Sequence, residues 1–91
     1  MTATAPIQLT QYGRMAEKHW REFLPNMVGE LEAEGRLQEA LQEAEERTAS
    51  ELYDLTMQFQ KEMTAQQAHD RAWEMVRERY IFLQPEQSEN E

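Results

Sequence analysis

Two histidines and two serines are the residues of this 91-residue chain that could most readily do chemistry, because it contains no cysteine. Metal sites in helical bundles are typically built from Glu-x-x-His pairs with further inward-facing glutamates. His19 and His69 do not fit this pattern, since position 16 is alanine and position 66 is glutamine. His19 lies one helical turn from Glu22, but two ligands do not make a metal cage. Ser50 and Ser88 have no candidate base beside them in the sequence, so we expect no metal site, no cofactor and no enzyme activity.

A small basic cluster is a candidate for nucleic-acid contact. Arg14, Lys18 and Arg21 share one face of a predicted helix, beside Trp20. Cations that flank an aromatic ring can grip a phosphate backbone while the ring stacks on a base. The alternative is an ordinary solvated face on which interleaved glutamates pair with these cations. The formal net charge of −9 favours the solvated face, because the field of the whole protein opposes nucleic acids and anionic membranes.

The negative charge is concentrated in the middle of the chain. Residues 29–63 hold ten acidic and three basic side chains, whereas residues 64–83 hold three of each. Acidic residues on a helix can offer negative charge in place of phosphate groups. Glu39, Glu43, Glu46 and Asp54 therefore suggest a further alternative function, that of an acidic decoy for a DNA-binding partner.

Helices must carry these residues, since good helix formers dominate the composition and glycine and proline number three each. Small or apolar residues recur every three or four positions at Leu37, Leu41, Ala44, Thr48, Leu52, Leu55 and Phe59. This spacing predicts one stripe on a long central helix. A helix over Gly35 to Met63 would be about 40 Å long, so other helices must cover its apolar side.

Local signals indicate where the helices begin and end. Thr10 is the expected N-cap of a first helix, and Pro25 fits the first position of a second helix after a bend. Gly35 either ends that second helix or is tolerated inside one rod from Pro25 to Met63, and the sequence leaves both alternatives open.

The last helix has the clearest start signal. Thr64 and Gln67 match the capping-box pattern, in which a threonine is followed three residues later by glutamine. We expect the helix to run from Ala65 to about Phe82 and to bury Ala68, Ala72, Met75, Val76 and Leu83.

The sequence therefore predicts an all-α protein of three or four helices, a helical hairpin or bundle with a long central helix. We expect a flexible leader at residues 1–9, a single helical domain at 10–84 and an acidic disordered tail at 85–91. The leader lacks the basic and apolar segments of a secretory signal, and no run of 18 apolar residues occurs. We expect a soluble cytoplasmic protein, as the absence of cysteine also favours.

The central stripe has two interpretations that the sequence leaves open. It is either the core side of the middle helix in a monomeric bundle or the seam of a homodimer. Its mean spacing, about 3.7 residues, is closer to a straight helix than to the 3.5 of a parallel coiled coil, so a dimer would pair antiparallel hairpins. The expected interface residues are Leu37, Leu41, Ala44, Leu52, Leu55 and Phe59, with Trp20 and Trp73 as anchors.

Three stretches resemble a known family. They are Tyr12-Gly13-Arg14-Met15, the segment from Glu22 to Pro25, and Leu31-x-x-x-Gly-x-Leu-x-x-x-Leu41. They are similar to the small transposon-encoded protein TnpV of bacterial mobile elements, with the likeness extending from Tyr12 to Phe82. This resemblance implies an accessory role on a mobile element and supplies no catalytic residues.

The resulting hypothesis is a non-catalytic helical protein-protein interaction or regulatory protein, a homodimer that also binds an unknown protein partner. The alternatives are a nucleic-acid-associated regulator that uses Arg14, Lys18 and Arg21, and the acidic decoy.

Overall fold

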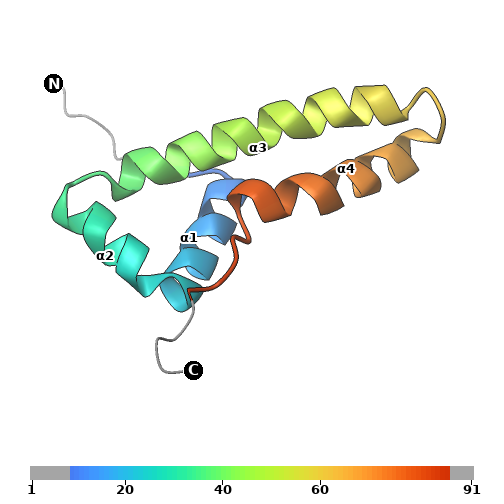
Figure 1. The fold of residues 1–91 in the computed structure, drawn as a ribbon. Helices are drawn as coiled ribbons and strands as arrows, with labels where there is room; N and C mark the ends of the chain where they lie inside the picture. The colour runs from blue at the N-terminus through green and yellow to red at the C-terminus, as the bar shows by residue number, and fades with distance from the viewer. Residues whose placement is uncertain (1–8, 87–91) are drawn as a thin grey trace, which may run out of the picture.

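Residues 9–86, the part of the chain that the structure describes, form four α-helices and no β-strand (Figure 1). In this computed structural model the helices are α1 (Gln11–Phe23), α2 (Pro25–Ala33), α3 (Leu37–Phe59) and α4 (Ala65–Tyr80). The predicted all-α fold with a long central helix is confirmed. The expected leader and tail, at 1–9 and 85–91, fall mostly outside the described residues.

The four helices are spread into a thin layer. Helices α3 and α4 form a long antiparallel hairpin, while α1 and α2 lie beside the first half of α3 (Figure 1). The molecule extends 51 × 45 × 14 Å along its principal axes, so one dimension is much smaller than the other two. Its radius of gyration is 15.8 Å, compared with about 12 Å for a compact chain of this length. Much of the helical surface is therefore not covered by a second layer.

Gly35 separates α2 from α3 and so resolves the alternative that the sequence left open. Its φ of +70° lies in the left-handed region that glycine adopts without strain. The backbone N–H of Gly35 donates to the carbonyl of Glu32, and that of Arg36 donates to the carbonyl of Leu31. This is the Schellman arrangement that closes many helix ends. The single rod from Pro25 to Met63 does not form.

The other predicted helix ends are mostly confirmed. Pro25 begins α2, and the backbone N–H of Gln67 donates to the Thr64 hydroxyl at 3.1 Å while the Gln67 amide oxygen accepts from Thr64 N–H. Thr10 precedes α1, but its side chain accepts no capping hydrogen bond; its hydroxyl instead donates to the carboxylate of Glu45 on α3. Helix α4 ends at Tyr80, two residues earlier than expected.

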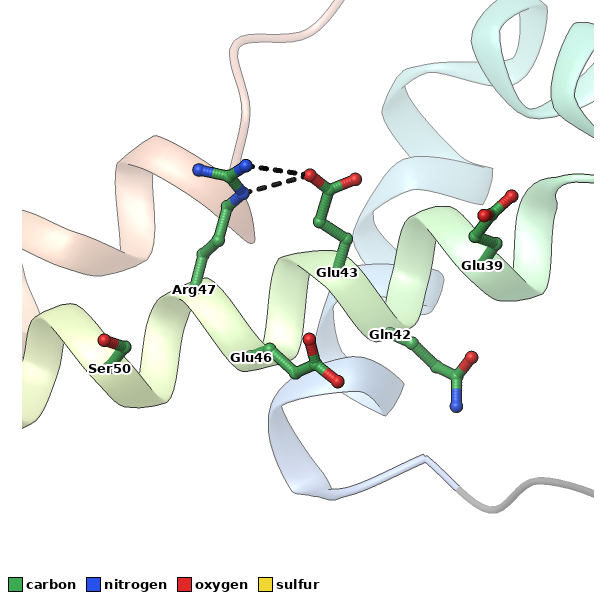
Figure 2. Close-up of a pocket in the computed structure, with 6 residues that line it drawn as sticks. All are labelled: Glu39, Gln42, Glu43, Glu46, Arg47 and Ser50. Carbon is green, nitrogen blue, oxygen red and sulfur yellow. Dashed lines mark hydrogen bonds and ion pairs between the residues drawn. The ribbon is translucent and has the colours of Figure 1, made fainter.

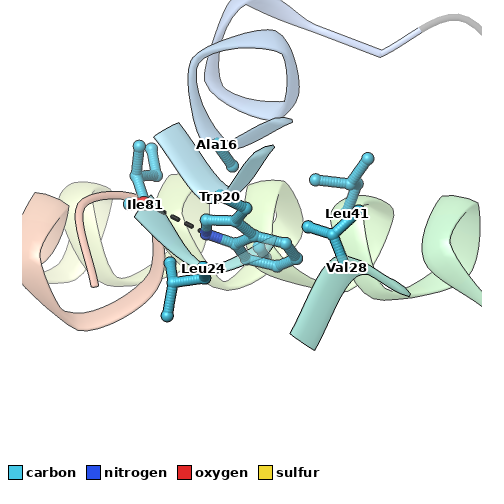
Figure 3. Packing of buried hydrophobic residues seen from close by; sticks show 7 residues of the cluster. Ala16, Trp20, Leu24, Val28, Leu41 and Ile81 are labelled. Atoms are coloured by element: carbon cyan, nitrogen blue, oxygen red, sulfur yellow. Dashed lines mark hydrogen bonds between the residues drawn. The ribbon is translucent and has the colours of Figure 1, made fainter. Parts of the chain in front are cut away.

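The main hydrophobic core lies where α1, α2 and the first half of α3 meet the segment after α4 (Figure 3). Trp20 is its centre, only 5% exposed, and its indole N–H donates to the carbonyl of Ile81 at 3.1 Å. The other buried members of the core are Ala16, Leu24, Val28, Leu41, Ala44 and Ile81.

A glycine on α1 allows that helix to approach α3 closely. A Cβ at Gly13 would lie 2.9 Å from the Cβ of Leu9 and would also clash with the Glu45 carboxylate. A side chain at this position would make Leu9 and the Glu45 carboxylate shift, which favours glycine here even though it weakens the helix.

Beyond this core, α3 and α4 pack on each other through a narrow seam. We call it the α3–α4 seam, and its buried residues are Thr48, Leu52, Ala68, Ala72 and Val76. The prediction that Met75 and Leu83 are buried was wrong for Met75, which is 38% exposed, while Leu83 is partly exposed. A seam between two helices covers only a narrow stripe of each, and Met75 lies outside this stripe.

Candidate protein-interaction surface

The residues expected at a dimer interface are divided between the core and the edges of the chain itself. Trp20, Leu41, Ala44 and Leu52 are buried within this chain. Leu37, Leu55, Phe59 and Trp73 are partly exposed, and the Trp73 ring stacks on Tyr12 with 5.5 Å between ring centroids. The stripe is thus mainly the core side of α3 in this structure, with Leu37, Leu55 and Phe59 left partly exposed along its edges.

A second stripe on α3 faces solvent. We call it the outer stripe and define it as Glu46, Ala49, Tyr53, Met57 and Lys61, all of which are exposed. Its steps of three and four residues place these side chains along one face of the helix. The Tyr53 side chain is 66% exposed and that of Met57 is 47% exposed. Tyr53 and Met57 are the largest exposed hydrophobic side chains of α3, and sequence reasoning did not select them.

The outer stripe is apolar in the middle and charged at its two ends. Ala49, Tyr53 and Met57 carry no charge, whereas Glu46 is acidic and Lys61 is basic. Lys61 lies just beyond the end of α3, where its backbone N–H donates to the carbonyl of Gln58 at 3.3 Å and continues the helical winding. The charge therefore changes sign from one end of the stripe to the other.

A polar cluster joins α4 to α3. Arg79 on α4 pairs with Glu51 on α3 at 2.7 Å, and the Tyr80 hydroxyl donates to the same carboxylate. The hydrogen bond from Tyr80, assisted by Arg79, lowers the pKa of Glu51, although partial burial acts in the opposite direction. The same contact raises the pKa of Tyr80. These bonds fasten α4 to α3 and do not form a catalytic arrangement of acid, base and nucleophile.

The basic cluster of α1 is largely engaged within the chain. The guanidinium of Arg14 donates to the carbonyl of Leu9 at 2.8 Å. Arg21 pairs with Glu17 at 3.0 Å and with Glu32 at 3.1 Å, and these hydrogen bonds raise the pKa of Arg21. Lys18 is exposed. The solvated-face interpretation describes Arg21, because its charge is already balanced by two glutamates.

The acidic residues proposed for a decoy line one shallow groove on the first half of α3 (Figure 2). The groove has a volume of about 510 Å³ and includes Glu39, Glu43 and Glu46, with Ser50 at one end. Arg47 crosses it and pairs with Glu43 at 3.0 Å, which offsets part of the negative charge. Asp54 does not line this groove.

The two histidines lie in different parts of the molecule. The His19 ring lies 4.7 Å from the Phe23 ring, centroid to centroid, and its Nε2 is 2.8 Å from the carbonyl oxygen of Leu83. The His69 side chain lies beside Asp70 on α4, 3.8 Å away. Within residues 9–86, no group of three or more His, Cys, Asp and Glu side chains could hold a metal ion. Ser88 lies outside the described residues.

No described helix is both long enough and apolar enough to cross a lipid bilayer. Comparison of the chain with protein-family models, with curated proteins and with solved structures gave no match. The resemblance to TnpV therefore stays a prediction from the sequence.

Proposed function

We propose that this protein is a non-catalytic helical protein-interaction or regulatory protein whose binding surface is the outer stripe of α3. Tyr and Met are among the residues enriched in the centres of protein interfaces, where their large side chains are desolvated on binding. We propose that the protein is cytoplasmic. We also propose that it is an accessory protein of a bacterial mobile element, which only the sequence resemblance supports.

The observation that carries this proposal is the exposure of Tyr53 and Met57 on a hairpin that extends beyond the main core (Figure 1). Domains are normally built from two or more packed layers of secondary structure, whereas the α3–α4 hairpin of this thin molecule extends beyond the main core. A partner chain would cover the side of the hairpin that the chain's own helices leave open.

Site-specific photocrosslinking in cells that produce the protein tests the proposal. A benzoylphenylalanine at position 57 should form adducts with another protein chain, and a Tyr53→Glu substitution should abolish them. The matched control places the same probe at Gln58, which is exposed on the other flank of α3. Absence of adducts at position 57, or equal yields at both positions, would contradict a binding role for the outer stripe.

The acidic decoy remains a second candidate because Glu39, Glu43 and Glu46 share one groove. If it acts in this way, replacing all three by glutamine should remove its ability to displace a basic partner from DNA. A fluorescence anisotropy competition assay measures this displacement. Variants of Tyr53 and Met57 should leave the competition unchanged.

A further inference from the structure

We infer that the occupant of the outer stripe is a second copy of this chain, paired antiparallel about a two-fold axis that passes close to Tyr53 and Met57. This inference rests on the function proposed above and specifies the partner. It makes the homodimer a contact between the outer faces of two α3 helices, away from the buried stripe of Leu41, Ala44 and Leu52.

The apolar middle of the outer stripe fits its own copy. In a two-fold interface each contact occurs twice, so the Tyr53 of one chain can lie opposite Met57 of the other at two equivalent places. A methionine sulfur beside an aromatic ring is a favourable contact. Ala49 flanks the pair with a small side chain, and this allows the two helices to approach closely.

The charges at the ends of the stripe select the antiparallel direction. When Tyr53 lies opposite Met57 of the second copy, Lys61 lies opposite its Ala49, and Glu46 is only three residues away, about 4.5 Å along the axis. Each lysine then meets a glutamate. Parallel pairing would instead place Glu46 beside Glu46 and Lys61 beside Lys61, which is unfavourable.

The distribution of net charge also permits a second copy to approach here. The chain carries −9, but residues 49–79 hold six acidic and four basic side chains, which leaves only −2 in this region. A second copy is therefore repelled less along residues 49–79 than along the acidic first half of α3. Pairing there would add a second helical layer to a molecule that is only 14 Å deep.

Sedimentation equilibrium of the purified full chain over a range of concentrations tests the inference. We expect a reversible dimer for the wild type and a monomer for the Tyr53→Glu, Met57→Glu double variant, with equal helix content by circular dichroism. Gln58→Glu is the matched control, because it adds a charge to an exposed position on the other flank of α3, and it should stay dimeric.

A charge exchange tests the direction of pairing. Glu46→Lys alone and Lys61→Glu alone should each raise the dimer dissociation constant about tenfold, since two attractive pairs become repulsive. The double variant Glu46→Lys, Lys61→Glu should return it close to the wild-type value. Destabilisation of one chain cannot explain such a rescue.

Three results would overturn the inference. They are a wild-type monomer at every concentration, a dimer that persists in the Tyr53→Glu, Met57→Glu variant, and charge variants that do not rescue each other. If the chain is monomeric but position 57 still crosslinks to a different protein, the proposed function stands and only the identity of the partner is wrong. If position 57 gives no crosslinks to any chain, the proposed function itself fails.

Discussion

Glu51 connects the two long helices through a single carboxylate. It accepts hydrogen bonds from Tyr80 and Arg79 of α4, and the first of these lowers the pKa of Glu51 most. The charged form is therefore favoured in the folded protein. A carboxyl group whose pKa is lower in the folded than in the unfolded protein stabilises the fold when the pH is above its unfolded-state pKa. This contribution is lost as the pH falls through its folded-state pKa.

We therefore predict that the stability of the Glu51→Gln variant depends less steeply on pH in the acidic range than the stability of the wild type does. The wild type should lose stability as the pH falls below the ordinary glutamate value of 4.5, and the variant should lose less over the same range. Thermal unfolding followed by circular dichroism at several pH values measures this. Glu62→Gln, in the exposed turn after α3, removes one charge elsewhere and should keep the wild-type slope.

Thr48 introduces an unsatisfied hydroxyl into the α3–α4 seam. Its side chain is fully buried, and its Oγ1 has no hydrogen-bond partner. Burying such a group costs about 1–3 kcal/mol. Thr48→Val should raise the free energy of unfolding by about 1 kcal/mol, because it keeps the branched shape and removes the hydroxyl. Urea denaturation measures this change, and a loss of stability in the valine variant would contradict it.

The junction between α2 and α3 depends on the left-handed backbone conformation of one residue. Gly35 has a φ of +70°, which an alanine adopts at a cost of about 1–2 kcal/mol. Gly35→Ala should therefore lower the free energy of unfolding by this amount, although no neighbouring atom opposes the added Cβ. The strain would arise entirely from the backbone.

Gly29 provides the matched control for this prediction. It lies inside α2, has a helical conformation and has no atom within 4 Å of an added Cβ. Gly29→Ala should raise the free energy of unfolding by about 0.5–1 kcal/mol, since alanine loses less backbone entropy in a helix. Thermal unfolding of the two variants should thus move in opposite directions, and equal shifts would contradict this account of the junction.

The helix ends could be predicted from the sequence where a residue type fits only one position relative to a helix. Pro25 cannot continue a helix but can begin one, and Thr64 with Gln67 forms a reciprocal pair of bonds. Gly35 was ambiguous because glycine is tolerated both within and after a helix. The bonds that decided it, between residues 31–36, depend on the direction in which α3 leaves, and this is set by tertiary packing.

The candidate surface was harder to predict than the fold. The interface was predicted at the most apolar stripe of α3. The most apolar stripe of a helix, however, normally faces the core of its own chain. The outer stripe of Tyr53 and Met57 is weaker and emerges only once the self-buried positions are known. Ile81 was not among the predicted core residues, and it is buried because the chain after α4 returns to the main core.

The uneven distribution of the core predicts uneven stability along the molecule. Trp20, Leu41 and Ile81 fill the core near α1, whereas the turn end of the hairpin is held by Leu52 and two alanines of α4. Local opening requires less free energy where fewer large side chains are buried. In hydrogen–deuterium exchange of the Tyr53→Glu, Met57→Glu variant, amides of 55–70 should exchange faster than those of 14–23. Equal protection would indicate a uniformly cooperative fold.

The contacts of α1 with the segment after α4 have a consequence for the order of events during synthesis. The acceptor for Trp20 lies 61 positions later in the chain, and Glu86 binds the first backbone N–H groups of α2 from a distance of about 60 residues. A nascent chain that has released only α1 and α2 from the ribosome lacks both partners. Until the segment that ends at residue 86 has also left the ribosome, Trp20 cannot complete its packing and stays accessible to chaperones.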